Sequence, residues 1–154
     1  MRCETDRCSH CEGWKYSAAS GKCYKYFHHF TTYKWATKVC ENRDHNGYQA
    51  VLASVPNQAT NDFIVSQFFE EKQNLENFKD FGLWLGGKMV SGQNGEWVDG
   101  TPWGFTNWAA NYAISGDLDE KRIVMMSTNE IGTWKLFEGF DGDTNFEANL
   151  ICQI

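Results

Sequence analysis

GEWVDGTP, residues 95–102, followed by Asn107-Trp108, is the stretch that decides the fold. Asp99, Gly100 and Pro102, which follow Trp97, are residue types that form turns. Large aromatic side chains contribute strongly to protein cores, so Trp97 and Trp84 are expected to be buried, and Trp108 is expected to fold back onto the core. The stretch therefore predicts the turn at which a long loop begins.

A first helix is predicted upstream, over Thr31–Glu41, with Thr31 or Thr32 at its capping position. Its apolar residues recur at i, i+1, i+4 and i+5, which places on one helical face Trp35, Ala36, Val39 and Cys40. A second helix is predicted to open at Pro56-Asn57, with Asn57 as its cap, and to end near Glu71 or Lys72. Ile64 and Phe68, at i and i+4, form its apolar face.

Short strands are predicted around these helices. They lie within 11–26, with a turn at Ser20-Gly21, and over Ala50–Val55. After Asp80, short apolar pieces alternate with Gly, Asn and Asp turns, while residues 99–121 predict neither strand nor helix. Two helices followed by strands and long loops indicate an α+β domain.

The composition of the chain argues against several classes of binding partner. The chain has 154 residues, a formal net charge of −6 and 16% aromatic residues, which fits one domain with a substantial core. Because no run of Lys or Arg occurs, neither a nucleic acid nor an anionic membrane is expected as a partner. No apolar run approaches the ~20 residues that a membrane-spanning helix requires, so membrane insertion is not expected.

Six cysteines are spread along the chain, which favours an oxidising compartment and therefore a secreted, extracellular protein. Six cysteines allow 15 pairings, and their spacing alone selects none of these. Cys3, Cys8, His10 and Cys11 have the short spacings of a zinc site, but a secreted setting favours disulfides over zinc.

Further short motifs occur before and after residues 95–108. In chain order they are CEGW at 11–14, GKCY at 21–24, Trp35-Ala36 with Cys40, WLGG at 84–87, and LIC at 150–152. In this order and spacing the chain resembles the C-type lectin-like family in its long form, and it looks similar to the soluble invertebrate lectins of that family. The resemblance covers Cys11 to Cys152. It implies a disulfide-stapled α+β C-type lectin-like fold, in which two helices flank small antiparallel sheets and a long loop region. Residues 1–10 are then a Cys-bearing extension, and residues 11–154 are the domain.

The resemblance also implies the disulfides Cys11–Cys23 and Cys40–Cys152. A bond that closes a loop of ~100 residues contributes about 4.7 kcal/mol in the chain-entropy model. Cys3 and Cys8 are left over, either as a local pair or for an intermolecular bridge. The family's second disulfide is absent, because Arg122 and about Gly139 stand at the positions of its cysteines.

In this family, calcium is held by oxygen donors from two three-residue motifs and from a Glu that lies between them in the sequence. By resemblance, the first triplet falls at about Tyr112-Ala113-Ile114 and the second at Trp134-Lys135-Leu136, so that Glu120 alone matches. The ammonium group of Lys135 would repel a cation. The sugar-bridging calcium site is therefore not expected, and neither is any other cofactor. Asp117, Asp119 and Glu120 remain candidates for a metal elsewhere, against the simpler interpretation of a solvated acidic loop.

The binding surface is expected on the long-loop face, residues 99–121 and 130–145, because a long segment rich in aromatics needs either a core or a partner. Its candidate ligand contacts are Trp103, Phe105, Asn111, Tyr112, Ile114, Asp117, Asp119, Glu120 and Lys135. Of these, Trp103 has no evident structural role and is expected to be exposed.

The leading hypothesis is a calcium-independent recognition module for an extracellular protein or glycan. The alternatives are a calcium-dependent lectin with rearranged ligands and a structural protein that adsorbs to mineral or ice. An enzyme is not expected, because His28 and His29, predicted between a strand and a helix, accompany no recognisable nucleophile motif and no Gly-rich phosphate loop is present. The oligomeric state is not predicted.

Overall fold

The structure, a computed structural model, describes residues 13–45, 48–69, 82–91, 94–110, 121–126, 130–138 and 148–154. Its helical elements are α2 (Tyr33–Glu41), α3 (Gln58–Ile64) and the π-helical turn η1 (Val65–Phe69). Its strands are β1 (Lys15–Ser17), β2 (Lys22–Thr31), β3 (Asp44–His45), β4 (Tyr48–Gln49), β5 (Val51–Leu52), β6 (Gly82–Ser91), β7 (Asn94–Trp97), β8 (Lys121–Met126), β9 (Trp134–Glu138) and β10 (Ala148–Gln153). The predicted α+β class is confirmed. The extension at residues 1–10 lies outside the described residues.

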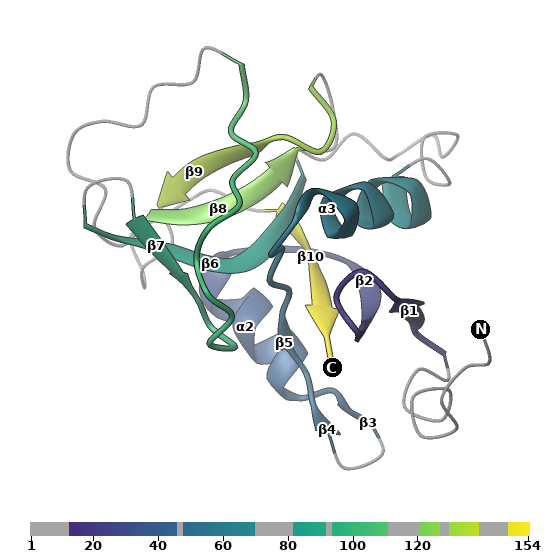
Figure 1. Cartoon of the computed structure of the whole chain (residues 1–154). Coiled ribbons are helices and arrows are strands. Elements are labelled where there is room, and N and C mark those ends of the chain that lie inside the picture. Colours follow the sequence, from purple (N-terminus) through teal and green to yellow (C-terminus); the bar gives the residue numbers. More distant parts are fainter. Residues whose placement is uncertain are drawn as a thin grey trace.

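One sheet of eight strands organises the described part of the chain (Figure 1). Its order is β1-β2-β10-β6-β8-β9, with β5 paired to β10 and β7 paired to β6. The β10–β6 pair is parallel, and the other pairs are antiparallel. The expectation of small antiparallel sheets is therefore corrected to one larger mixed sheet, beside the short β3–β4 pair. The reason is that β10 joins the N-terminal strands to β6.

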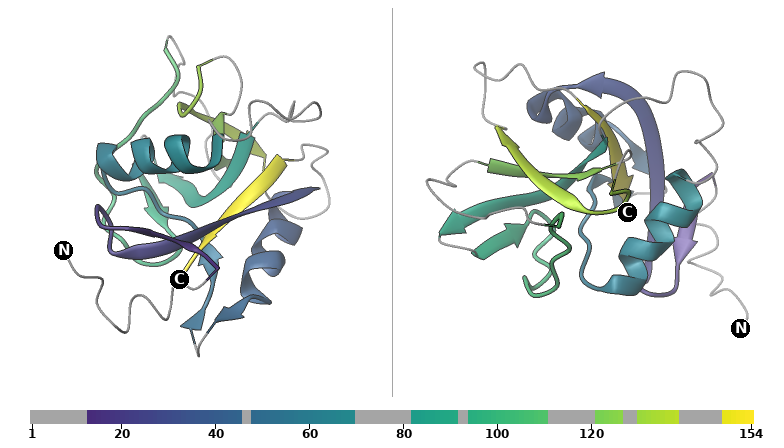
Figure 2. Two further views of the ribbon diagram at one scale, coloured as in Figure 1. Left: turned by 90° about the vertical axis from the view of Figure 1, so that its right-hand side faces the viewer. Right: turned by 90° about the horizontal axis from the view of Figure 1, so that it is seen from above.

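Both faces of this sheet carry a core, because side chains alternate between the faces along each strand. In β8, Ile123 and Met125 belong to one hydrophobic cluster, whereas Val124 and Met126 belong to the other. α3 supplies Ile64 to the first cluster, and α2 supplies Ala36 to the second. The helices thus cover opposite faces of the sheet (Figure 2).

α2 begins at Tyr33, two residues later than predicted. Thr32 holds the N-cap position but makes no side-chain capping hydrogen bond. Ala36 and Cys40 are fully buried, as their spacing predicts. Trp35 is not on this buried face, since 56% of its surface is exposed. Tyr33 packs inward instead, with its ring edge-on to Trp84 at 5.4 Å.

α3 confirms its predicted start. Asn57 is its N-cap, and the Oδ1 atom of Asn57 accepts from the backbone N–H of Thr60 at 2.8 Å. Ile64 and Phe68 are buried as predicted, although Phe68 lies in η1 rather than in regular α-helix. The predicted end near 71–72 lies outside the described residues.

Two strand boundaries differ from the prediction. β2 runs to Thr31 and includes His28 and His29, because β10 pairs with β2 as far as Ala148↔Thr31. The two histidines therefore do not lie between a strand and a helix. β5 is confined to Val51–Leu52, since the chain leaves the sheet after Leu52.

The Cys40–Cys152 disulfide is confirmed and joins α2 to β10 across 112 residues of sequence. Cys23 is also disulfide-bonded. Its expected partner Cys11 lies outside the described residues, as do Cys3 and Cys8, so those two pairings stay predictions. Within the described part of the chain no cysteine is free.

Removing the α2–β10 crosslink by the double substitution Cys40→Ala and Cys152→Ala should lower the free energy of unfolding by about 2–5 kcal/mol. The bond closes a long loop and limits the unfolded chain. Urea titration followed by circular dichroism measures the change, and Ser66→Ala, at an exposed helical position, serves as the control. An unchanged urea midpoint in the double variant would contradict this role.

Candidate ligand-binding site

Three of the predicted ligand contacts, Trp103, Phe105 and Lys135, fall within the described residues, and all three are half-buried. The remaining six lie outside them: Asn111, Tyr112, Ile114, Asp117, Asp119 and Glu120. The structure therefore defines the beginning of the long loop, residues 99–110, and the facing segment, residues 130–138.

Trp134 is the centre on which the long loop packs. It is fully buried, and three aromatic rings meet its indole edge-on at 5.7 Å, those of Trp97, Phe105 and Trp108. Edge-to-face pairs at such distances stabilise beyond the area that they bury. Trp108 thus folds back as predicted, and Trp84 and Trp97 are core residues as predicted.

Trp103 does not fit its prediction. Its ring lies 5.3 Å from that of Trp97, tilted by 37°, and it packs against the core cluster. Gly95 allows this approach, because a Cβ atom at Gly95 would come within 2.9 Å of the Trp103 ring. The expectation that Trp103 has no structural role is therefore wrong, and only part of its surface remains available to a ligand.

Backbone hydrogen bonds fix the same segment. The Trp134 N–H donates to the carbonyl of Asn107 at 2.8 Å, and the Ala109 N–H donates to the carbonyl of Trp134 at 3.1 Å. The side-chain amides of Asn107 and Asn61 both donate to the carbonyl of Gly132, at 2.8 and 3.1 Å. The Trp134 indole N–H donates in turn to Asn61 Oδ1 at 2.9 Å. Loop, β9 and α3 are thereby joined into one unit.

The side chains that the structure describes in β9, from Trp134 to Phe137, carry no oxygen atom. Trp134 and Leu136 point into the core, where Leu136 is 8% exposed, while Lys135 occupies the alternate position, opposite Val124 of β8. Across the described residues, no three His, Cys, Asp or Glu side chains gather where they could hold a metal ion.

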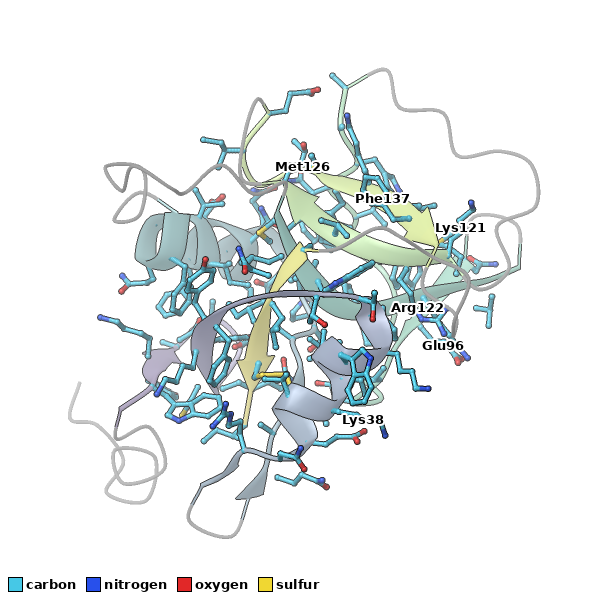
Figure 3. The ribbon with its side chains drawn as sticks, turned by 180° about the vertical axis from the view of Figure 1, so that it is seen from behind. Lys38, Glu96, Lys121, Arg122, Met126 and Phe137 are labelled. Carbon is cyan, nitrogen blue, oxygen red and sulfur yellow. A yellow bond between two sulfur atoms is a disulfide. The ribbon has the colours of Figure 1, made fainter. Side chains whose placement is uncertain are left out.

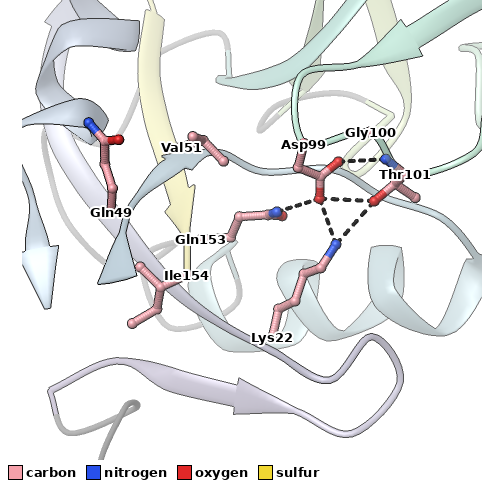
Figure 4. A pocket seen from close by; sticks show the side chains of 8 residues that line it. All are labelled: Lys22, Gln49, Val51, Asp99, Gly100, Thr101, Gln153 and Ile154. Carbon is pink, nitrogen blue, oxygen red and sulfur yellow. Dashed lines mark hydrogen bonds and ion pairs between the residues drawn. The ribbon is translucent and has the colours of Figure 1, made fainter. Parts of the chain in front are cut away.

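A polar cluster around Asp99 stands at the base of the loop (Figure 4). Asp99 Oδ2 accepts from Lys22 Nζ at 2.6 Å, from Gln153 Nε2 at 2.7 Å, and from the hydroxyls of Ser54 and Thr101, both at 2.9 Å. The Thr101 N–H donates to Asp99 Oδ1 at 3.0 Å. The carboxylate therefore holds together the start of β2, the segment before α3, the loop base and the end of β10.

The electrostatics of Asp99 follow from these contacts. Burial by itself would raise the pKa of Asp99, but hydrogen bonds from Lys22, Thr101 and Gln153 outweigh burial and hold this pKa well below its usual range. Burial also raises the pKa of the nearby Tyr24 hydroxyl to about 12, against the opposing effect of a 2.8 Å hydrogen bond with Ser20.

A depression of about 500 Å³ opens beside this cluster, and Val51 lines both this depression and a second groove of about 180 Å³. The Lys22 ammonium group has three donors, and Asp99, Thr101 and Ser54 lie at hydrogen-bonding distance from it. Because these groups satisfy one another, the cluster supports the loop rather than offering donors to a ligand. Sequence reasoning missed it, because nothing in the spacing indicates that residues 22 and 99 meet.

Asp99→Asn should lower the free energy of unfolding by about 2 kcal/mol at neutral pH, since a charged hydrogen-bond acceptor is lost. The carboxylate has a lowered pKa in the folded state, so its stabilising contribution is present above the unfolded-state pKa of about 4 and is lost as the pH falls below that value. The difference between wild type and variant should therefore shrink between about pH 4 and pH 2. Denaturant titrations across this range measure it, with the exposed Asp62→Asn as control; a pH-independent difference would contradict the assignment.

Trp103→Ala should lower the free energy of unfolding by about 2 kcal/mol, because it removes a half-buried ring from Trp97. Trp103→Phe should retain most of that stability. Thermal unfolding compares the two variants. If Trp103→Ala melted like the wild type, the packing of Trp103 on Trp97 would be energetically irrelevant.

None of the described helices is long and apolar enough to cross a membrane, and no family model matches the chain. Curated relatives do match it. A snaclec that binds coagulation factors IX and X, from Protobothrops flavoviridis, is 30% identical over 99 residues, covering 62% of this chain and 59% of the relative. The corresponding protein from Echis carinatus is 32% identical over 98 residues, covering 62% of this chain and 70% of the relative. The chain thus spans less than two thirds of the first of these relatives.

Solved structures agree over nearly the whole chain. Human lithostathine gives a TM-score of 0.72 at 19% identity, covering 100% of this chain and 96% of that one. The C-type lectin CEL-I from Cucumaria echinata gives 0.70 at 19% identity, with 99% and 97% covered. A calcium-independent C-type lectin from Saxidomus purpuratus, SPL-2, gives 0.64 at 22% identity, with 92% and 91% covered. Because sequence relatives and structural neighbours agree, the chain belongs to the C-type lectin-like family.

Proposed function

We propose that this protein is an extracellular recognition module that binds a protein or glycan ligand on its long-loop face without a bridging calcium ion. The relatives in sequence are named as binding proteins for coagulation factors, and the structural neighbours include lectins. Both kinds of protein bind partners and are not named as enzymes, which supports recognition rather than catalysis.

The observation that carries the proposal is the conformation of β9. A calcium ion takes 6–8 oxygen ligands. The two residues after Trp134 are Lys135 and Leu136, whose side chains end in an amine and a hydrocarbon and supply no oxygen. Leu136 is part of the core, where it packs in the cluster that contains Trp134 and Ile123. A carboxylate at position 136 would have to be buried among these apolar side chains, which is costly for a charge. β9 therefore favours packing over metal binding.

The described part of the loop face offers a rigid base for such recognition. Its aromatic rings are held by Trp134, and its backbone is bonded to β9. Ile131, between β8 and β9, is 36% exposed, and Glu130 beside it accepts from the Ala110 N–H at 2.8 Å. A surface that is already ordered loses less conformational entropy when a ligand binds.

Calcium should not stabilise the protein. A ligand that binds only the folded state raises the melting temperature by mass action, so adding calcium or a chelator should leave the melting temperature unchanged, and calorimetry should detect no strong site. A large chelator-sensitive shift would overturn the proposal in favour of a calcium-dependent lectin with rearranged ligands.

The ligand itself can be sought with a glycan array and a panel of extracellular proteins, each probed with and without chelator. Ile131→Asp, on the loop face, should weaken the binding that is found, because it places a charge in the contact. Val90→Asp is the matched control, since Val90 is 41% exposed on β6. Equal binding by both variants would remove the loop face as the binding surface.

A further inference from the structure

A groove of about 180 Å³ lies between α2 and β5. Three parts of the chain line it, namely α2, β5 and the residue that follows β7. The lining residues are Tyr33, Thr37, Glu41, Val51, Leu52 and Val98. The volume is well below the roughly 300–1,000 Å³ of a cleft that holds a whole small molecule. The groove therefore matches one side chain of a larger partner.

The walls of this groove are held in place by the surrounding fold. The Cys40–Cys152 disulfide joins α2 to β10, and β5 pairs with β10 at Cys152↔Leu52. The third wall is fixed because the Val98 N–H donates to the carbonyl of Gly86 at 2.7 Å. A groove whose walls are already ordered loses little conformational entropy on binding.

Most of the lining suits an aliphatic chain. Leu52 is buried, Val51 is half-buried and Val98 is 51% exposed. The hydroxyl of Thr37 donates to the carbonyl of Tyr33 at 3.1 Å, so this hydroxyl is already bonded within the helix. Covering such apolar surface with the methylene groups of a ligand is favourable.

Glu41 carries the only charge among the lining side chains. Because it lies at i+4 from Thr37, it projects from the same side of α2. It is exposed, and within the described part of the chain its carboxylate forms no ion pair. As the last residue of α2, it is opposed by the helix dipole, which disfavours an anion at this end. A cation bound beside Glu41 would offset this local cost.

The basic residues nearest to Glu41 in the sequence do not neutralise it. Arg43 places its guanidinium 4.9 Å from the centre of the Phe27 ring. Lys38, which Figure 3 shows on α2 in the view from behind, lies in the last turn, where a cation suits the helix dipole. No ion pair joins Lys38 to Glu41 among the described residues. The carboxylate is therefore available to a partner.

We propose that this groove binds a basic side chain, lysine or arginine, of a partner protein, with its aliphatic stem against Val51 and Val98 and its charge beside Glu41. Lysine and arginine bury their stems on apolar surface while the charged end stays in water. Apolar walls beside an exposed carboxylate match this division. Arg122 sets the direction of the stem, because its guanidinium, 4.8 Å from the centre of the Tyr33 ring, disfavours a second cation at that end.

Titration of the isotope-labelled full chain with n-butylammonium, followed by amide chemical shifts, tests the proposal. This probe reproduces the stem and charge of lysine, whereas n-butanol keeps the stem and lacks the charge. The amides of Val51, Leu52 and Val98 should shift, and n-butylammonium should bind more tightly than n-butanol. Glu41→Gln should weaken n-butylammonium binding about two- to fivefold, as expected for an exposed ion pair, and should leave n-butanol binding unchanged. Asp62→Asn, at an exposed position of α3, makes the same charge change and should bind like the wild type.

The amide spectra also establish that each variant is folded. Equal affinities for n-butylammonium and n-butanol would overturn the proposal, as would equal effects of Glu41→Gln and Asp62→Asn. A capped glycine peptide with one central lysine should shift the same amides, and its failure to do so would assign the groove to a free alkylamine instead of a protein. None of these outcomes bears on the loop face, which packs on the cluster around Trp134 and which Ile131→Asp tests separately.

Discussion

The carboxylate of Asp99 is the constraint on which the rest of the structure depends. Its Oδ2 atom accepts from Lys22, Ser54, Thr101 and Gln153, which belong to segments far apart in the sequence. A shielded carboxylate is stable only when its hydrogen bonds are made, so these segments must meet in one geometry. Gly100, at a φ of +83°, then turns the chain away from the cluster, a conformation that favours glycine. The long loop thus leaves the sheet from a fixed point.

Beyond the Asp99 cluster, aromatic packing fixes the next part of the long loop. From Trp103 to Trp108 the loop lies against Trp97 and Trp134, so aromatic packing holds this part of the loop on the core. Arg122 of β8 places its guanidinium 4.8 Å from the centre of the Tyr33 ring. This contact joins β8 to α2.

Local patterns predicted the features that depend on neighbours in the sequence. Helical spacing predicted the burial of Ala36 and Cys40, and the cap at Asn57 followed from its residue type and position. The exposure of individual side chains was predicted less well, because it depends on which other parts of the fold cover them. Trp35 lies beside Ala36 on the helix, yet Tyr33 takes the inward position. Trp103 is covered because the loop folds back onto Gly95 and Trp97 of β7. The Asp99 cluster joins residues 77 positions apart, and no periodicity encodes such a meeting.

The sheet separates the loop face from the face that α2 covers. Neighbouring residues of β8 belong to different cores, Ile123 to that of the loop and Val124 to that of α2. A substitution on α2 therefore disturbs the packing beneath the loop face only by acting through a fully packed layer.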